Sequence, residues 1–274
     1  MPDAGSPIRM THSATPDILA DWLAALEARH LADLRFQEVT RALRALSSAY
    51  VERRHKVARG STLDSHGKRA AFALFYAPLH FLATHHVVSA LDTAMPAPSR
   101  IVDIGCGTGA AGAAWAIASG GASVIGIDRH PWAVDEAHWT YRTLHVRGQA
   151  RQGDATRLPR LQPGTAVIAA YVLNELPEEA RQRLEMSLVA AAAGGARVLV
   201  LEPIATSVTP WWETTAARVV AAGGRADQWR ISIDVPPLVR SLADAAGLNV
   251  GELKFKSLFI AGMRYPAMSV ERDQ

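Results

Sequence analysis

Hydrophobic residues recur at helical spacing in the first third of the chain. Between Pro16 and Leu46 they fall three or four residues apart, which predicts two or three amphipathic helices. A further helix or helix pair is predicted from Ala70 to Leu91, with Pro78 opening its second part. Residues 1–15 show no such period and are predicted to form a flexible leader. The helical region is therefore expected to occupy residues 16–98.

After residue 98 the pattern changes to short apolar runs that alternate with helical periods. These runs predict strands at 101–104, 123–128, 150–152, 166–171 and 197–202, and helices at 110–119, 177–192, 211–222 and 237–246. Two final runs, 253–255 and 258–261, are predicted to form a closing antiparallel pair. Such alternation is typical of a parallel sheet with helices on both faces. The sequence predicts a doubly wound α/β domain over residues 99–274.

The composition is that of an ordinary globular protein, with 49% hydrophobic and 20% charged residues. No uninterrupted apolar run reaches the roughly 20 residues of a membrane span, and the first residues lack the pattern of an export signal. A cytoplasmic protein without a membrane partner is expected. Cys106 is the single cysteine, and His80, His85 and His86 lack the i, i+4 spacing of a helical metal site. No metal is expected.

The formal net charge of +3 is unevenly distributed. The segment from Arg41 to Arg69 contains eight Lys or Arg residues and two acidic residues. Such a patch can attract the phosphate backbone of a nucleic acid. It can equally be a solvated helical face whose Arg stems cover apolar neighbours. Both interpretations stay open.

Three glycines fall where the first predicted strand turns into its helix. Gly105, Gly107 and Gly109 lack Cβ atoms, so the backbone can turn tightly and a ligand can lie against it. Because the spacing from Gly105 to Ala110 also satisfies the dinucleotide fingerprint, the glycines alone do not identify the cofactor.

The surrounding acids are more specific. Asp103, the extra Gly109, and Asp128 at the end of the second strand together resemble motif I and its acidic partner in class I S-adenosylmethionine methyltransferases. The similarity continues at residues 152–155 and 170–176, which follow the third and fourth strands. The resemblance implies a Rossmann-like, mostly parallel seven-stranded sheet with an N-terminal helical extension.

The resemblance also implies a cofactor, S-adenosylmethionine, with S-adenosylhomocysteine as the product. Asp103 would hold the amino-acid end through the loop, Asp128 the ribose hydroxyls, and Asp154 the adenine amine. The expected cofactor-binding residues are Asp103, Gly105, Cys106, Gly107, Gly109, Asp128, Arg129, Asp154, Ala155 and Tyr171.

A narrower resemblance involves residues 69–80, 171–176 and 201–203. These segments are similar to the small-ribosomal-subunit methyltransferase-like proteins of bacteria and mitochondria, over roughly residues 46–201. Those proteins commonly carry a cysteine cluster that binds iron–sulfur, whereas residues 224–237 contain no cysteine. The chain would be a cluster-free relative or a paralogue that kept the scaffold, so the ribosomal substrate is not simply carried over.

Glu175 is the best candidate for orienting or deprotonating the methyl acceptor, and its alternative role is to cap the helix predicted from 177. Asn174, His80 and Tyr76 complete the catalytic candidates. Further candidates for lining the site are Glu202 and the pair Trp211–Trp212, for which burial against the sheet is an equal alternative. Because Cys106 lies inside the glycine loop, it cannot act as a covalent nucleophile, and an N or O acceptor is expected.

Two kinds of acceptor stay open. RNA or a ribosome-associated substrate is suggested by the narrower resemblance and by the basic segment. A small molecule is suggested by the missing cysteines and by a helical region able to close a compact pocket. A non-catalytic assembly factor and a nicotinamide-dependent oxidoreductase are further alternatives. The sequence gives no indication of the oligomeric state.

Overall fold

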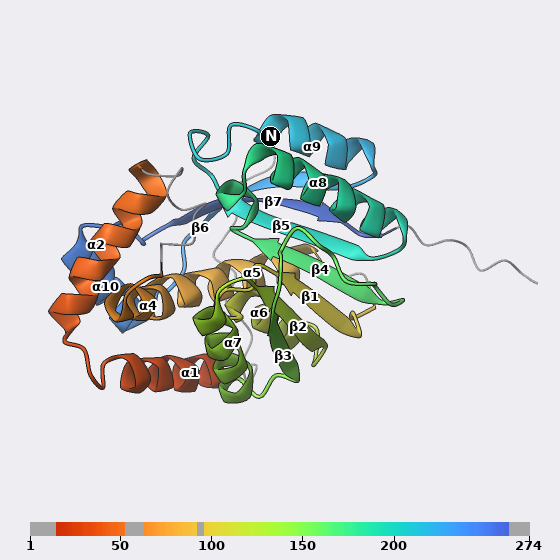
Figure 1. Ribbon diagram of the computed structural model, residues 1–274. Coiled ribbons are helices and arrows are strands. Elements are labelled where there is room, and N and C mark those ends of the chain that lie inside the picture. The colour runs from red at the N-terminus through yellow and green to blue at the C-terminus, as the bar shows by residue number, and fades with distance from the viewer. Residues whose placement is uncertain (1–14, 53–62, 92–95, 263–274) are drawn as a thin grey trace, which may run out of the picture.

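The computed structural model describes residues 15–52, 63–91 and 96–262, and Figure 1 shows them as a twisted sheet with helices on both faces. The elements are, in chain order, α1 (Thr15–His30), α2 (Phe36–Glu52), α4 (His66–Ala71), the π-helical turn η1 (Phe72–Tyr76), α5 (Ala77–Leu91), β1 (Arg100–Ile104), α6 (Ala110–Ala118), β2 (Ser123–Asp128), α7 (Pro131–Thr143), β3 (Gly148–Gln152), β4 (Thr165–Ala170), the 3-10 turn η2 (Leu173–Glu175), α8 (Glu178–Ala193), β5 (Arg197–Pro203), α9 (Trp212–Ala221), β6 (Arg225–Ile231), α10 (Pro237–Ala246) and β7 (Leu253–Ile260).

The sheet has seven strands in the order β3-β2-β1-β4-β5-β7-β6. The five strands from β3 to β5 are parallel, and β7 runs antiparallel to both β5 and β6. The strand order reverses between β1 and β4, which is where doubly wound folds form a ligand crevice at the carboxyl ends. The predicted α/β fold with a mostly parallel seven-stranded sheet is confirmed.

The prediction of a closing antiparallel pair within residues 253–261 is wrong. These residues form one continuous strand, β7, whose antiparallel partners are β5 and the unpredicted edge strand β6. Lys256 and Ser257 are polar but buried inside β7, and they interrupt the apolar run in the way that a turn would. Strand β6 is mostly polar because it lies at the sheet edge and is largely exposed.

One continuous helix runs from His66 to Leu91 through α4, η1 and α5. Its middle turn is wider than an α-helical turn, because the N–H of Ala77 donates to the carbonyl of Phe72 five residues earlier. This turn precedes Pro78, so the helix accommodates the proline and does not split into a pair. By length and composition the helix could cross a membrane, but most of its apolar window is buried, as in the core helix of a folded domain.

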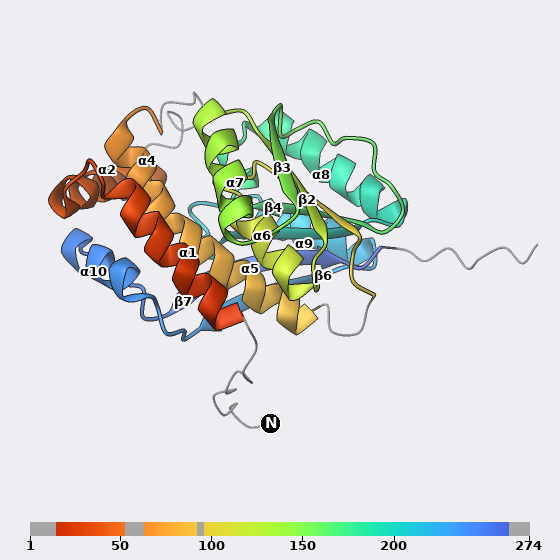
Figure 2. The ribbon, with the colours of Figure 1, turned by 90° about the horizontal axis from the view of Figure 1, so that it is seen from below.

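The helical extension is anchored to the α/β domain by a buried carboxylate. Glu136 of α7 is 1% exposed, and its two oxygens lie 2.8 Å from His30 Nε2 and 3.2 Å from an Arg29 nitrogen at the end of α1. Two turns earlier in α1, Trp22 packs against Phe81 of α5 with ring centroids 5.6 Å apart. Figure 2 shows α1, α2, α4 and α5 gathered beside the sheet. These contacts fix the extension over the carboxyl ends of the strands.

Candidate active site

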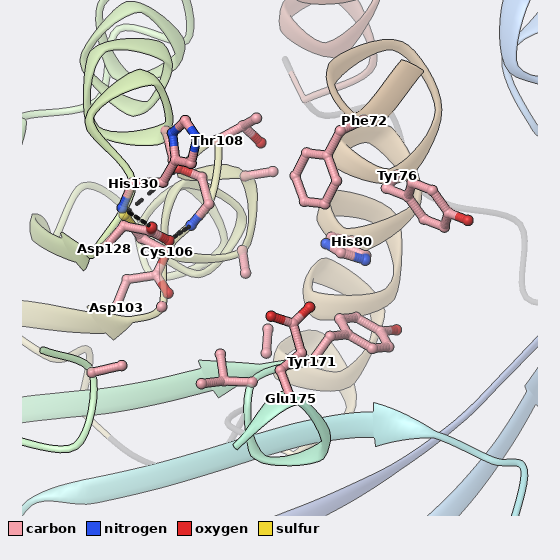
Figure 3. Close-up of a pocket in the computed structure, with 18 of the residues that line it drawn as sticks. Phe72, Tyr76, His80, Asp103, Cys106, Thr108, Asp128, His130, Tyr171 and Glu175 are labelled. Atoms are coloured by element: carbon pink, nitrogen blue, oxygen red, sulfur yellow. Dashed lines mark hydrogen bonds between the residues drawn. The ribbon is translucent and has the colours of Figure 1, made fainter. Parts of the chain in front are cut away.

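A cavity of about 930 Å³ lies where the carboxyl ends of the strands meet the long helix. Figure 3 shows Asp103, Asp128 and Cys106 of the glycine loop on one side and the helix side chains on the other, with Glu175 beside Tyr171. Of the residues expected at the site, the lining includes Tyr76, His80, Asp103, Gly105, Cys106, Gly107, Asp128, Arg129, Asp154, Ala155, Tyr171, Asn174 and Glu175. The fold therefore brings the two expected groups, cofactor-binding and catalytic, into one cavity.

The carboxylate of Asp128 holds the glycine loop through hydrogen bonds. One oxygen accepts the N–H of Gly107 at 2.9 Å, and the other accepts the N–H of His130 at 2.8 Å. Gly107 has φ of +51°, in the left-handed region that residues with a Cβ rarely adopt. Asp128 thus holds the loop in a conformation that depends on glycine.

Gly109 does not line the cavity, although it was expected among the cofactor-binding residues. It precedes α6 with φ of +77°, and an added Cβ would lie 2.7 Å from the ring of Tyr141. In the structure this glycine therefore allows α6 to pack closely against α7.

Asp103 is a buried acid at the end of β1 and is 1% exposed. One of its oxygens accepts the N–H of Gly112 at 2.9 Å. Burial and, to a smaller extent, the nearby charge of Asp128 raise the pKa of Asp103 to about 7, against the opposing effect of the Gly112 hydrogen bond. Among the described residues no Lys or Arg forms an ion pair with it. An ammonium group, such as that of S-adenosylmethionine, would complement this carboxylate, so the residues fit the cofactor.

Asp154 lies at the rim of the cavity with a half-exposed side chain. One of its oxygens accepts hydrogen bonds from both the backbone N–H and the hydroxyl of Thr156, each at 2.8 Å. These bonds lower the pKa of Asp154, so it stays ionised and able to accept further bonds.

The long helix presents three rings to the cavity, two from the π-helical turn η1 and one from α5. Phe72, Tyr76 and His80 are spaced four residues apart, and their ring centroids are 5.8 to 6.2 Å from one another. Burial lowers the pKa of His80 to about 3, so its imidazole is neutral at physiological pH. The hydroxyl of Tyr76 points away from the cavity in Figure 3, and Tyr76 hydrogen-bonds to Ser47. Phe72 was not expected at the site, although its spacing from Tyr76 and His80 is the signal that could have found it.

Tyr171 follows β4 in a left-handed conformation with φ of +60°, which is unusual for a residue with a side chain. Its N–H donates to the carbonyl of Leu201 at 2.7 Å. Its ring stacks on His80, with centroids 4.2 Å apart and planes inclined by 17°. Strained backbone of this kind is concentrated at functional sites.

Glu175 lies in the turn η2, which follows Tyr171. Burial raises the pKa of Glu175 to about 7, while the positive charge of Arg129 opposes that shift. No side-chain hydrogen bond caps α8, so the structure gives no support to the capping role for Glu175. A carboxyl group with a pKa near neutrality can exchange protons at physiological pH.

Glu202 and the two tryptophans do not line the cavity. Glu202 is fully buried, and one of its oxygens accepts the N–H groups of Leu173 at 2.8 Å and Asn174 at 3.3 Å. These two hydrogen bonds hold the turn η2 in place. Trp212 is buried beneath Lys256, whose ammonium lies 4.5 Å from the ring centroid, and Trp211 packs against Arg181. Burial against the sheet is therefore the arrangement observed for Trp212, while Trp211 is partly buried beside Arg181 of α8.

Replacing Glu202 by glutamine is expected to make stability less dependent on pH. Burial raises the pKa of Glu202 from 4.5 to about 8, despite opposing bonds from Leu173 and Asn174. The folded state therefore favours the neutral acid, and the wild type loses stability as pH rises through about 8. Urea unfolding at pH 5, 7 and 9 should show a loss on the order of a few kcal/mol in the wild type that is smaller in Glu202→Gln.

Glu202→Ala serves as the control, because it removes the acceptor of two backbone N–H groups. Relative to Glu202→Gln it should lose about 1–3 kcal/mol at every pH, because neither variant carries the titrating carboxyl group. Parallel pH curves for the wild type and Glu202→Gln would contradict the assignment.

Among the described residues, no group of three or more His, Cys, Asp or Glu side chains could hold a metal ion. His85 stacks on Phe81, and His86 packs edge-on against Trp229. These two histidines of the long helix therefore take part in ring packing.

The comparisons with known proteins agree with this geometry. Residues 101–195 match a family described as a methyltransferase domain. No curated protein matches the chain. Among solved structures, a proposed O-methyltransferase from Nostoc punctiforme is 14% identical with a TM-score of 0.52, covering 80% of this chain and 72% of that one. At such identity the likeness shows a shared fold.

Two other solved structures are similar at TM-scores of 0.49. The plantazolicin methyltransferase in complex with SAH is 12% identical, with 83% of this chain and 98% of that chain covered. The mitomycin 7-O-methyltransferase is 16% identical, with 92% and 76% covered. The domain match covers the glycine loop and its acids. It favours a methyltransferase over the oxidoreductase and assembly-factor alternatives. The chain is an S-adenosylmethionine-dependent methyltransferase with the class I fold.

Proposed function

We propose that the methyl acceptor is a small molecule that enters the cavity beneath the helical extension. The observation that carries this proposal is the charge of the lining. Among the described residues that line the cavity, Arg129 is the one Lys or Arg, whereas Asp103, Asp128, Asp154 and Glu175 are acidic. Recognition of RNA depends on cations that neutralise phosphates. Because acidic residues outnumber cations in this lining, it favours a methyl acceptor without a phosphate backbone.

The size of the cavity supports the same proposal. Pockets for small molecules and cofactors span about 300–1,000 Å³ and are mostly apolar with a few placed polar groups. At about 930 Å³, this cavity is at the upper end of that range, which leaves room for a compact acceptor beside the cofactor. The apolar part of its lining includes Leu79, Leu176, Val208 and Leu253.

The proposed roles divide between two sides of the cavity. Asp103, Asp128 and Asp154 hold the cofactor, which supplies an electrophilic methyl group when bound. On the other side, Glu175 accepts a proton from the acceptor, and the neutral His80 helps to orient it. Transfer requires the acceptor atom to be held close to the methyl carbon and in line with it, so positioning supplies much of the rate.

The described part of the basic segment gives little support for RNA binding. Lys68 pairs with Asp64 at 2.9 Å, and Arg69 donates to the carbonyl of Leu63 at 2.9 Å. Arg44 donates to the carbonyl of Ala245 in α10. These three cations therefore make contacts within the chain. Four others, Arg53, Arg54, Lys56 and Arg59, lie outside the described residues.

Filter binding to single-stranded RNA at several salt concentrations tests the proposal. We expect weak binding, with indistinguishable curves for the wild type and for a variant in which Arg53, Arg54, Lys56 and Arg59 are neutralised together. An RNA enzyme would instead show a log–log salt slope of about −0.7 per phosphate contacted, flattened by about two to three units in the variant. That result, with unchanged S-adenosylmethionine binding, would overturn the small-molecule proposal.

A further inference from the structure

We infer that the acceptor is a flat, uncharged aromatic compound bearing a hydroxyl group, and that it stacks against an aromatic wall formed by Phe72, Tyr76, His80 and Tyr171. This inference rests on the proposed small-molecule function and names its substrate class. All four rings line the one cavity, and they come from two segments far apart in the sequence. Figure 3 shows His80 between the helix and the turn that carries Glu175.

The wall is held in place by contacts beyond the cavity. The centroids of Phe75 and Tyr76 are 5.1 Å apart with their planes nearly perpendicular, which is a favoured edge-to-face arrangement. Tyr171 keeps its left-handed backbone through the bond to Leu201 and places its ring parallel to His80. A strained residue that is fixed in this way gives a preorganised surface. Of the four rings, His80 and Tyr171 are the parallel pair, and Phe72 stands edge-on to His80. The pair leaves an outer ring face on which a flat ligand can stack, while Phe72 and Tyr76 flank that face.

The charges around the wall favour an uncharged ligand. His80 is neutral, because burial lowers its pKa to about 3. Among the described residues that line the cavity, Glu175 is the acid on the side of the wall, and Arg129 lies close enough to lower its pKa electrostatically. Glu202 also lies near Tyr171 but does not line the cavity. Asp103 and Asp128 lie across the cavity with the glycine loop, where the cofactor would bind. A permanent cation would therefore meet no unopposed acid at the wall.

The adjacent polar groups suit a hydroxyl. Asn174 lines the cavity, and its side-chain oxygen is buried without a hydrogen-bond partner among the described residues. This oxygen can accept the hydrogen bond of the substrate hydroxyl when the substrate first binds. Because a hydroxyl carries one hydrogen, that bond is exchanged for one to Glu175 before the methyl transfer. In the transfer, the acceptor oxygen bonds to the methyl carbon as the carbon–sulfur bond breaks and leaves its electron pair on sulfur. The hydroxyl proton passes to the carboxylate of Glu175.

Calorimetry with a matched pair of ligands tests the substrate class. The protein is saturated with S-adenosylhomocysteine and titrated with 2-naphthol or with its saturated analogue, decahydro-2-naphthol. The two share a hydroxyl and a similar size, but only the first has aromatic faces. We expect 2-naphthol to bind about two- to tenfold more tightly. Equal affinities, or tighter binding of the saturated alcohol, would overturn the inference.

A pair of variants tests whether the wall provides this preference. His80→Leu keeps apolar volume but removes the ring, and it should bring the two affinities together. His85→Leu removes a second imidazole from the same helix, which stacks on Phe81 and does not line the cavity. It should keep the wild-type ratio. A ratio that survives in a folded His80→Leu protein would overturn the assignment of the wall, and the wild-type comparison stands if that variant does not fold.

Two further ligands distinguish failure of this inference from failure of the small-molecule proposal. Benzyltrimethylammonium would bind more tightly than 2-naphthol if the wall were a cation cage, and that result would overturn the inference alone. Transfer of labelled methyl to decahydro-2-naphthol in preference to 2-naphthol would do the same. Labelled methyl on an RNA oligonucleotide, with none on either alcohol, would overturn both proposals.

Discussion

Replacing Asp128 by alanine is expected to abolish measurable binding of S-adenosylmethionine. The carboxylate holds Gly107 and His130 through two charge-assisted hydrogen bonds at 2.9 and 2.8 Å. Each such bond is worth about 1.5–3 kcal/mol, so their joint loss, before any ribose contact is counted, weakens binding by a factor of about 100 or more. Calorimetry on the purified variant, with circular dichroism to confirm folding, measures this effect.

Asp154→Ala is the matched control for Asp128→Ala. Its side chain is half exposed at the rim, and its hydrogen bonds join only the neighbouring Thr156. We expect a loss of affinity of about tenfold or less, because an exposed hydrogen bond contributes about 0.5–1.5 kcal/mol. If Asp128→Ala bound the cofactor as tightly as the wild type, the carboxylate would not be part of the cofactor site.

Glu175→Gln is expected to lower kcat by a factor of about 100 to 10,000, the usual contribution of a positioned general base. Glutamine has nearly the same shape as glutamate but cannot take the proton, so affinity for the cofactor should not change. The assay uses an acceptor that the wild-type enzyme methylates. Glu178→Gln is the matched control, because Glu178 is exposed at the start of α8 and bonds to Gln182. Full kcat in Glu175→Gln would remove Glu175 from the chemistry.

The pH dependence of the wild-type enzyme provides a second measurement for Glu175. A general base acts in its ionised form, and burial moves the pKa of Glu175 from 4.5 to about 7. Activity should therefore be full above about pH 7 and should fall about tenfold for each pH unit below it. In Glu175→Gln this limb of the kcat/KM profile should disappear. A wild-type profile that stays flat down to pH 5 would contradict the assignment.

The strands could be predicted where burial makes them plain in the sequence. Strands β1, β4 and β5 are covered on both faces, so they are nearly continuous apolar runs. Strand β6 could not be found in this way, because its exposed residues are polar and its pairing with β7 is non-local. Helix α7 was not predicted either. Its buried residues include Glu136 and Thr140, which interrupt the apolar period of a helix.

Part of the candidate site follows from topology. Acids at the ends of β1 and β2 meet because parallel strands end at the same edge of the sheet, so Asp103 and Asp128 could be placed together from the sequence. The position of Glu202 could not. It directly precedes the end of β5, but its side chain turns inward and accepts bonds from η2, a contact between segments 28 to 29 residues apart. The wide turn at Phe72–Tyr76 also has no local sequence signal.

The bonding pattern of η1 means that this turn holds one residue more than an α-helical turn would. Deleting one residue would let the bonds return to the i→i+4 pattern without breaking the helix. Each α-helical residue advances by about 100°, because 3.6 residues complete a turn, so a one-residue deletion in a regular helix rotates its two flanks by about that angle. In η1 the wide turn already accommodates the extra residue, so after the deletion Phe72 would still face the glycine loop and His80 would stay against Tyr171. A single-codon deletion is therefore expected to be tolerated better in η1 than in the regular helix on either side of it.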